Sequence, residues 1–580
     1  MSDDTMPDDT FATLTPLNPL ARLAFSEVYE TLISSPQNSL SDGAQAALSR
    51  MAVDGEQVFD KDVLHLRLEM EKKLFHNDGD GDISESPTEP DTDTEQLHQN
   101  LGMIWVGRYS LAFDSTPLEE ERGWKIGKGP TEKVPMDLLL CTRSYAKWHE
   151  INLRNPHARI NFDTQTRSLY IIGCSRSMLA QLTVNGEAVP RRPHHLNQHT
   201  MKVRLDKLEY DFRWTDYAAT KEYVGERGKY VIRALHGPTI PMIDMPTPSP
   251  NQTTIGKWTL GKPLGKGARG RVFFGSDSSG DIAAIKLVER TSQNCGPVDE
   301  EVKILQEVTN LASKSDDNER ILRMVDVIYP NQETFPSKAP FDHVAMVLKP
   351  MAHQTLLALV RVASRGERSN RGSKGMTMEA ASVFRDALEG VKVMHDAGWL
   401  HRDLKPANIG IIGTPPRGVL LDLGMAMKLQ VGGSLPPEPC TVGTINYLAP
   451  ELEMINYDHS IDIWSMGVIL YELTYGVHPW KFASNPWCNA KVSQEVRLAF
   501  ENSYHTAMKT MRVDASRARA SPTDGYIHLG ALFAEMVRHR YVENNNLRRP
   551  DINEVLAHPA WGSLLPDTSQ VKRQRLGDEP

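Results

Sequence analysis

The sequence predicts a multidomain protein, in which an all-β sandwich is followed by an α+β domain with a strand-rich first half and a helical second half. Three observations lead to this prediction. The chain has 580 residues, which is enough for several domains. Short apolar strands separated by polar turns fill residues 101–217. From residue 256 to residue 562, strand-like segments come first and helical patterns follow.

The composition is that of a globular protein, with 40% hydrophobic and 24% charged residues. The net charge of −9 gives no sign of direct nucleic-acid binding. The five cysteines form no CxxC pair, which argues against a zinc site or a disulfide framework and favours a reducing compartment. The acidic start resembles no secretory signal, and no apolar run approaches the roughly 18 residues that span a bilayer. We expect no membrane partner and a cytoplasmic and/or nuclear location.

Three segments outside these two domains are expected to have little packed structure. Residues 1–100 combine helical periodicity in "NPLARLAFSEVYETLI" and "DVLHLRLEMEKKLF" with the acidic stretch "HNDGDGDISESPTEPDTDTEQ", which we expect to be disordered. Residues 218–255 are proline-rich, which favours an extended linker. The tail 563–580 is expected to be disordered, and its basic cluster "KRQR" is either a weak nuclear signal or simply solvated.

The segment 101–217 contains the strands of the predicted sandwich. They are "DLLL", "HARINF", "SLYIIG", "AQLTVNG", "MKVRL" and "YDFRWT". Each is short, is rich in apolar, β-branched and aromatic residues, and is bounded by polar turns. This spacing is typical of a β-sandwich.

Three glycines near the start of the second domain follow the pattern GxGxxG in "LGKGARGRVFFG". Gly265, Gly267 and Gly270 precede β-prone residues, not a helix, which indicates a hairpin laid over phosphates. Lys286 follows in the apolar strand "AAIKL", and we expect it to hold the α- and β-phosphates. The alternative is an edge-strand lysine that reaches water.

A cation in an apolar strand needs a counter-charge, and the helical segment "DEEVKILQEV" supplies one. We assign Glu301 as the partner because it shares a helix face with Leu305. Glu300 and Glu307 remain alternatives. We expect the pair to be partly exposed, like a pair near a surface helix.

The stretch "WLHRDLKPANIGII" places polar residues between apolar flanks, and "VLLDLG" follows it. Asn408 and Asp422 offer hard oxygen ligands from separate loops, which suits Mg²⁺ beside a bound phosphate. Asp403 is then free to accept the proton of a substrate hydroxyl. Lys405 can neutralise charge on the transferred phosphoryl group.

Residues 256–562 resemble the eukaryotic protein kinase catalytic domain. The matching signatures are "GKGARGRV", "AIK", "HRDLKPAN", "DLG", "GTINYLAPE", "DIWSMGVILYEL" and "RRPDINEVLAHPAW". The resemblance implies a bilobal α+β fold with a β-rich N-lobe and a helical C-lobe, ATP and Mg²⁺ as cofactors, and protein substrates. It implies that Lys286, Glu301, Asp403 and Lys405 act in catalysis and that Asn408 and Asp422 bind the metal.

The resemblance also implies a nucleotide site and several structural contacts. The implied nucleotide site comprises Gly265, Lys266, Gly267, Gly270, Val272, Ala284, Lys286, the gatekeeper Leu348, and the hinge residues Lys349 and Met351. Pro350 removes one backbone donor from that hinge. The implied structural residues are the ion pair Glu451–Arg549, the brace Asp462, and an apolar spine with Leu305, His401 and Leu423.

Two residues resemble the Ser/Thr branch of the family, namely Lys405 and Thr444 of "GTINYLAPE". Ala407 stands where many kinases that prefer basic substrates have Glu. Arg402 precedes Asp403, and in the family such an arginine often contacts a phosphate on the activation segment, here residues 422–451. Our hypothesis is that phosphorylated Thr441 pairs with Arg402. The alternative is that Glu438 fills this role without modification.

Residues 101–217 resemble a forkhead-associated (FHA) domain, a sandwich that reads phosphothreonine, through "GWKIGKG", "HARINF" and "AQLTVNG". The phosphate-reading positions depart from the family, since Arg154 and Ala180 stand where it has Ser and Asn. We therefore expect an intact fold with altered binding. Lys128, Arg143 and Arg154 are candidates for holding a phosphopeptide. The alternative is that they are surface charges.

The sequence thus supports two hypotheses of different classes. The first is an active Ser/Thr protein kinase, whose pairing with an FHA-like domain is similar to that of checkpoint kinases. The second is a pseudokinase scaffold, whose FHA-like domain binds proteins or phosphopeptides. The complete catalytic set favours the first.

Overall fold

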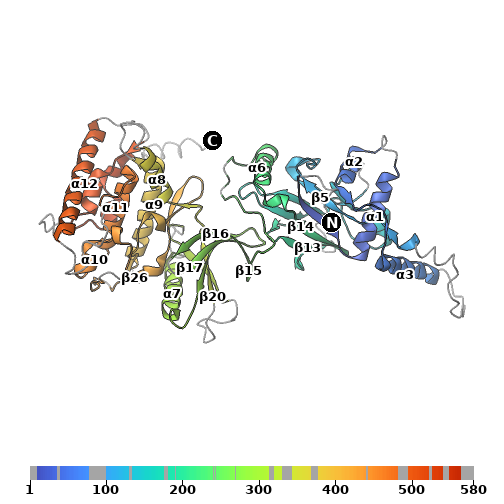
Figure 1. Cartoon of the computed structure of the whole chain (residues 1–580), viewed down its shortest axis with the longest axis horizontal. Helices are drawn as coiled ribbons and strands as arrows, with labels where there is room; N and C mark the ends of the chain where they lie inside the picture. Colours follow the sequence, from blue (N-terminus) through green and yellow to red (C-terminus); the bar gives the residue numbers. More distant parts are fainter. Residues whose placement is uncertain are drawn as a thin grey trace, which may run out of the picture. The chain divides into compact units, whose positions relative to one another are not determined.

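The computed structural model divides into two compact units, Met1–Lys262 with Gly275–Ile282 and Pro263–Phe274 with Ala283–Pro580. Figure 1 shows the elements of both. The structure describes residues 9–35, 40–77, 100–129, 134–174, 181–189, 191–239, 241, 243–267, 270–312, 319–329, 343–366, 376–430, 432–438, 442–480, 494–520, 526–539 and 548–563. Within these ranges, no helix is both long enough and apolar enough to cross a membrane.

Besides the short pair of β3 (Val58–Phe59) with β4 (Met103–Ile104), most described strands of the first unit form two sheets. One has the order β11-β10-β13-β14-β1-β5-β2 and the other β12-β9-β8-β6-β7. The strands of the first sheet are β1 (Thr10–Pro16), β2 (Met51–Val53), β5 (Gly107–Ala112), β10 (Leu182–Val184), β11 (Glu187–Ala188), β13 (Thr200–Leu205) and β14 (Leu208–Trp214). Those of the second are β6 (Trp124–Lys128), β7 (Leu138–Cys141), β8 (Ala158–Phe162), β9 (Leu169–Gly173) and β12 (His194–His195). Buried side chains from both sheets share one core.

The side-chain pattern explains why these segments are strands. In β13, exposed and buried residues alternate along the whole strand, as they do when one face of a sheet packs on a core. The turn between β10 and β11 consists of Asn185 and Gly186, which both have positive φ angles of 50° and 85°. Asn-Gly is the preferred pair for a two-residue hairpin turn with this geometry.

The first unit begins much earlier than the expected boundary at residue 101. β1 pairs with β14 and with β5, and its Phe11 is fully buried. Helices also belong to this unit, so it is a sandwich with added helices. They are α1 (Pro19–Ile33), α2 (Asp42–Ser49), α3 (Lys61–Asn77), α5 (Arg143–Trp148) and α6 (Lys221–Leu235). The acidic stretch that we expected to be disordered lies, from residue 78, outside the described residues.

The linker expected over 218–255 starts with a helix. The Thr220 hydroxyl accepts a hydrogen bond from Tyr223 N at 3.2 Å, which caps the start of α6. Tyr223, Tyr230 and Val231 of α6 are buried in the core of the first unit. The prolines that suggested a linker lie only after this helix, so the segment before them was free to pack.

A six-stranded sheet with the order β15-β16-β17-β18-β20-β19 follows in the chain. Its strands are β15 (Thr254–Ile255), β16 (Trp258–Gly267), β17 (Gly270–Ser276), β18 (Ile282–Glu289), β19 (Arg323–Ile328) and β20 (His343–Lys349). Helix α7 (Cys295–Ala312) packs against β19. This part corresponds to the β-rich lobe that the sequence predicts.

After β20, the second unit is mainly helical (Figure 1). Its helices are α8 (Leu357–Gly366), α9 (Met378–Asp396), α10 (Pro450–Met454), α11 (Ser460–Tyr475), α12 (Gln494–Ala520), α13 (Gly530–Met536) and α14 (Ile552–Leu556). Residues Ile461–Tyr475 of α11 are all buried, and this helix contacts α8, α9 and α13. A helix that is buried on every side is typical of the centre of a fold.

Short strands position the polar loops next to these helices. β23 (Trp399–Leu400) pairs with β26 (Met427–Lys428), and β24 (Ile409–Ile412) forms a hairpin with β25 (Arg417–Leu420). Residues 401–408 connect β23 to β24. The polar cluster of the sequence therefore lies on a loop that is held by strands at both ends.

Candidate active site

Three side chains surround the carboxylate of Asp403 on the loop between β23 and β24. Lys405 Nζ lies 2.8 Å from Asp403 Oδ2, and the Thr444 hydroxyl donates to Asp403 Oδ1 at 2.7 Å. Asn408 Nδ2 donates to Asp403 Oδ2 at 3.0 Å. Lys405 also donates to Thr444 Oγ1 at 2.8 Å. Thr444 lies 41 positions after Asp403, so the activation segment returns to the catalytic loop.

Asp462, from the first turn of α11, fixes the backbone of this loop. It accepts hydrogen bonds from His401 N at 2.8 Å and from Arg402 N at 3.0 Å. His395 Nε2 lies 2.9 Å from Asp462 Oδ2, a contact that we did not predict from the sequence. Burial by itself would raise the pKa of Asp462, but its hydrogen bonds to His395 and His401 hold that pKa below its ordinary value. The brace is thus an ionised carboxylate.

The residues of the implied spine are all buried. Leu305 on α7 and Leu423 belong to the core of the second unit, and His401 is fully buried. His401 Nε2 lies 3.0 Å from Leu421 O, which links the catalytic loop to the strand end before Asp422. Leu423 of the "DLG" signature therefore packs in the core.

Lys286 on β18 forms an ion pair with Glu301 on α7. A second carboxylate, Asp422 Oδ1, lies 3.5 Å from Lys286 Nζ. The side chains of Lys286 and Glu301 are only 11% and 2% exposed, whereas Asp422 is 49% exposed. The expectation of a partly exposed pair was wrong, because α7 packs its Glu301 face against the sheet and against Gly424.

The glycine-rich segment forms the end of β16 and the start of β17. Gly265 and Gly267 belong to β16, and Gly270 begins β17. A Cβ on Gly270 would lie 2.6 Å from Leu287 O, so glycine is required there by the neighbouring strand as well. A Cβ on Gly265 would meet no atom within 4 Å, which leaves its backbone accessible to a ligand. The Lys266 side chain lies outside the described part.

The strand register places the other residues of the implied nucleotide site. Ala284 on β18 is opposite Leu348 on β20, and Lys286 is opposite Met346. Leu348 and Met351 are buried, while Val272, Ala284 and Lys349 are half-buried. β20 ends at Lys349, so the implied hinge begins where the strand ends.

The residues implied in metal binding fit a cation that keeps part of its water shell. Asn408 uses its amide nitrogen for Asp403, which leaves the amide oxygen as a possible ligand. Asp422 adds a half-exposed carboxylate. Among the described residues, no group of three or more His, Cys, Asp or Glu could enclose a metal ion. Two oxygen donors and a bound phosphate suit Mg²⁺, which rarely takes an all-protein cage.

Arg402 pairs with Glu438 in this structure, with Arg402 Nη1 2.5 Å from Glu438 Oε1. The Tyr457 hydroxyl contacts both side chains, and sequence reasoning missed it because Tyr457 carries no family signature. Thr441, the residue that we expected to be phosphorylated, lies outside the described residues.

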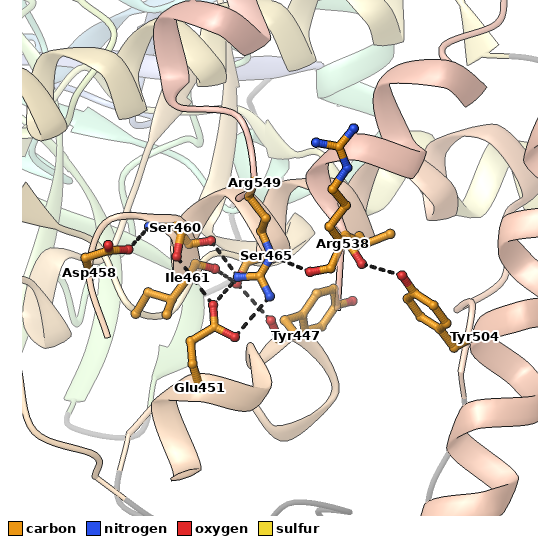
Figure 2. Close-up of polar contacts among 10 residues, drawn as sticks. Tyr447, Glu451, Asp458, Ser460, Ile461, Ser465, Tyr504, Arg538 and Arg549 are labelled. Carbon is orange, nitrogen blue, oxygen red and sulfur yellow. Dashed lines mark hydrogen bonds and ion pairs between the residues drawn. The ribbon is translucent and has the colours of Figure 1, made fainter. Parts of the chain in front are cut away.

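Figure 2 shows another buried ion pair of this unit, between Glu451 on α10 and Arg549. Arg549 Nη2 also donates to Glu451 Oε2 at 3.0 Å, so the pair is bidentate. The same guanidinium donates to Ser460 O at 3.1 Å and to Arg538 O at 2.9 Å, and it lies 4.8 Å from the centre of the Trp464 ring. This arrangement ties the end of the activation segment to α11 and to the chain before α14.

A further buried carboxylate lies beside the activation segment. Tyr447 OH donates to Glu472 Oε2 on α11 at 2.8 Å. Burial raises the pKa of Glu472 to about 7, although the hydrogen bond from Tyr447 acts in the opposite direction. Sequence reasoning missed this contact, since both residues lie within apolar-looking family signatures.

Of the three candidate anion-binding residues of the sandwich, two lie next to each other and the third lies on another element. Lys128 N donates to Arg154 O at 3.2 Å, so these two residues are neighbours at the end of β6. Burial lowers the pKa of the adjacent His157 to about 4, and the charges of Arg154 and Lys128 contribute in the same direction. Arg143 is exposed at the start of α5, on a different element from the other two.

Comparison with known proteins gives matches to protein kinases. Calcium-dependent protein kinase 19 of Oryza sativa is 28% identical over 269 residues, covering 43% of this chain and 44% of that protein. Serine/threonine-protein kinase ICK of Mus musculus is 31% identical over 228 residues, covering 39% and 32%. Serine/threonine-protein kinase PEPKR2 of Arabidopsis thaliana is 38% identical over 102 residues, covering 18% and 21%. The chain spans less than half the length of each of these relatives.

The family described as "Protein kinase domain" matches residues 258–560, which is slightly more than half of the chain. The matched range contains the Asp403 cluster, the Lys286–Glu301 pair and the Glu451–Arg549 pair. The chain therefore belongs to the protein kinase family.

Proposed function

We propose that this chain is a Ser/Thr protein kinase that transfers the γ-phosphoryl group of ATP to hydroxyl groups of protein substrates. One observation carries this proposal. Asp403 meets Lys405, Thr444 and Asn408 within 3.0 Å, and Lys286 meets Glu301. Both polar clusters that phosphoryl transfer needs are therefore assembled. The relatives whose printed names include "Serine/threonine-protein kinase" support the choice of hydroxyl.

The proposed reaction follows from the position of each group. Asp403 accepts the proton of the substrate hydroxyl, while the hydroxyl oxygen attacks the γ-phosphorus and the bond to the leaving ADP oxygen breaks. Lys405, held by Asp403 and Thr444, neutralises charge on the transferred group. Lys286 holds the α- and β-phosphates. Asn408 and Asp422 would hold Mg²⁺, which neutralises phosphate charge and orients the γ-phosphoryl group when bound.

A direct assay of phosphoryl transfer tests this proposal. The full chain is incubated with ³²P-labelled ATP and a generic Ser/Thr protein substrate, in parallel with Asp403→Asn and with Asp396→Asn. Asp396 is an exposed carboxylate on α9 whose neutralisation should leave the rate unchanged. We expect Asp403→Asn to lose nearly all transfer. Equal rates for wild type and Asp403→Asn would reject the proposal and favour the pseudokinase scaffold.

The first unit supports a second, separate proposal. Its two sheets and the Asn-Gly turn after β10 are compatible with an FHA-like sandwich. We propose that Lys128 and Arg154, neighbours at the end of β6, hold a phosphate group of a phosphoprotein, as in a checkpoint-like kinase of the cytoplasm or nucleus. Fluorescence anisotropy with phosphothreonine and matching unphosphorylated peptides tests it. Equal weak binding of both peptides, unchanged in Lys128→Ala/Arg154→Ala, would mean that these are surface charges.

A further inference from the structure

Arg402, the residue before Asp403, has an unusual backbone conformation that is fixed by its neighbours. Arg402 has a positive φ of 65°, which is uncommon for a residue with a side chain. Its N–H donates to Asp462 Oδ1 at 3.0 Å, and the side chain is buried. A Cβ on Gly443 would lie 2.7 Å from Arg402 O, so the activation segment passes close behind it. The guanidinium is therefore attached to a backbone that Asp462 and the activation segment hold from two sides.

This guanidinium contacts two separate parts of the described activation segment and a tyrosine that follows it. Arg402 Nε donates to Met425 O at 2.8 Å, near the start of the segment. Arg402 Nη1 donates to Glu438 Oε1 at 2.5 Å and to the Tyr457 hydroxyl at 2.8 Å. The Tyr457 hydroxyl in turn donates to the same Glu438 oxygen at 2.5 Å. Arg402, Glu438 and Tyr457 thus form a closed ring of hydrogen bonds.

The carboxylate in this ring is brought there by a fixed backbone. Glu438 N donates to Leu452 O at 2.9 Å, and Leu435 and Tyr457 exchange two backbone hydrogen bonds of 2.8 and 2.9 Å. Burial, assisted by the hydrogen bond to Glu438, raises the pKa of Tyr457 to about 12. The hydroxyl therefore keeps its proton and remains a donor at physiological pH.

A buried guanidinium needs a counter-charge, since burying an unpaired charge is strongly unfavourable. A phosphate added to the segment is one source of that charge, and a carboxylate already in the sequence is another. Here the carboxylate of Glu438 forms the ion pair with the guanidinium, and backbone hydrogen bonds of Glu438 and of Tyr457 hold the pair in place. No added phosphate is needed to neutralise Arg402 or to connect it to the segment.

We infer that Glu438 is a positioning residue that holds the activation segment in its catalytic arrangement, so that this kinase is active without phosphate on that segment. The inference rests on the proposed kinase function. Glu438 acts through Arg402, which is adjacent in sequence to Asp403, and through the segment that delivers Thr444 to Asp403. Loss of the Glu438 charge should slow the transfer step more than it weakens ATP binding.

The test uses the full chain produced together with a broad-specificity protein phosphatase, with intact mass showing that no phosphate remains. We expect this wild type to keep most of the initial rate of untreated protein. In the same preparation, Glu438→Gln should lower kcat about tenfold or more with little change in KM for ATP. Glu438→Asp, which restores a carboxylate, should recover part of kcat. Tyr457→Phe should cost about threefold, the worth of one hydrogen bond.

The control is Glu495→Gln, which removes the same charge from an exposed position on α12 and should behave as wild type. Two results would overturn the inference. One is a phosphate-free wild type as inactive as Asp403→Asn, whose rate returns after phosphorylation of the segment. The other is a Glu438→Gln variant with wild-type kcat. If untreated wild type is itself no better than Asp403→Asn, the proposed kinase function fails as well. The phosphate-free wild-type rate decides the matter even if Glu438→Gln does not fold.

Discussion

Two buried ion pairs of the kinase domain, Arg549–Glu451 and Lys286–Glu301, differ in the polar groups that surround them. Arg549 and Glu451 bring one charge of each sign, and two further guanidinium donors go to Ser460 O and Arg538 O. Lys286 lies between two carboxylates, Glu301 and Asp422, so this site carries one negative charge too many. Asp422 is also half exposed. A saturated, neutral pair is typical of a structural role, whereas surplus charge that faces solvent is typical of a site that awaits a cationic ligand.

The largest expected effect on the transfer rate comes from breaking the Lys286–Glu301 pair, whose site carries the surplus negative charge. Lys286→Met should reduce transfer about 100- to 1,000-fold, because it removes a cation that stabilises charge in the transition state. It should also destabilise the chain by about 3 kcal/mol, since Glu301 is left as a buried carboxylate without its partner.

The double variant Lys286→Met/Glu301→Gln separates these two effects. With both charges gone, the free energy of unfolding should return to within about 1 kcal/mol of wild type, because a neutral amide needs no counter-ion. Transfer should stay as low as in the single variant. Urea denaturation and ³²P transfer measure both quantities. Recovery of activity in the double variant would mean that the phosphates are held elsewhere.

Breaking the neutral pair, Arg549–Glu451, should lower stability strongly and change the transfer rate only a little. Arg549→Met should lower the free energy of unfolding by about 3 to 5 kcal/mol, since it leaves Glu451 buried and unpaired and removes donors from two carbonyls. Burial would raise the pKa of Glu451, but the charge and hydrogen bonds of Arg549 keep it below its ordinary value, so it is ionised before the substitution. The activity per folded molecule should change only a few-fold. A catalytic loss at temperatures where the variant is fully folded would contradict the structural assignment.

A third buried carboxylate sharpens the comparison, because it has a hydroxyl for a partner and no cation. Burial raises the pKa of Glu472 from 4.5 to about 7, so the folded chain binds a proton there that the unfolded chain has already released. Its contribution therefore turns unfavourable as pH rises from about 4.5 to 7 and remains so above pH 7. The variant Glu472→Gln should not show this loss of stability, because an amide does not titrate.

The expected difference is measurable by urea denaturation between pH 5 and pH 8. Over this range, wild type should lose about 2 kcal/mol relative to Glu472→Gln. Parallel pH dependences for the two proteins would show that Glu472 is ionised throughout. Tyr447→Phe is a useful companion, because removal of its hydrogen bond should push the pKa of Glu472 still higher.

The smallest effect is expected one residue before Arg549. Arg548 also forms a bidentate pair, with 2.6 Å from each terminal nitrogen to Glu554, but both side chains are exposed to solvent. The hydrogen bonds from Arg548 lower the pKa of Glu554 to about 2, yet water screens such a pair. Arg548→Met should leave the denaturation midpoint and the transfer rate unchanged. A clear loss of stability would show that burial is not what separates these neighbouring arginines.

The sequence by itself determined the residues of the catalytic loop, because they are local. Asp403, Lys405 and Asn408 lie within six positions, so a single loop geometry brings them together wherever the rest of the chain lies. Six strands of the sandwich were also predictable, since each carries its own apolar pattern between turn residues; they are β7, β8, β9, β10, β13 and β14. The order of strands before helices in the second domain follows from the same local signals.

Tertiary structure alone decided which distant segments meet. β1 carries no signal that distinguishes it from a loop, and it became a strand because β14, about 200 residues later, offers it a partner. The prolines after α6 suggested a linker, but tyrosines of that helix were buried by the core of the first unit. Lys286 and Glu301 were expected near solvent, and the packing of α7 on the sheet buried them. The sequence offered Arg402 two partners, and only the folded segment brought Glu438 to it. Pairing and burial depend on contacts between residues far apart in the chain, which local patterns do not specify.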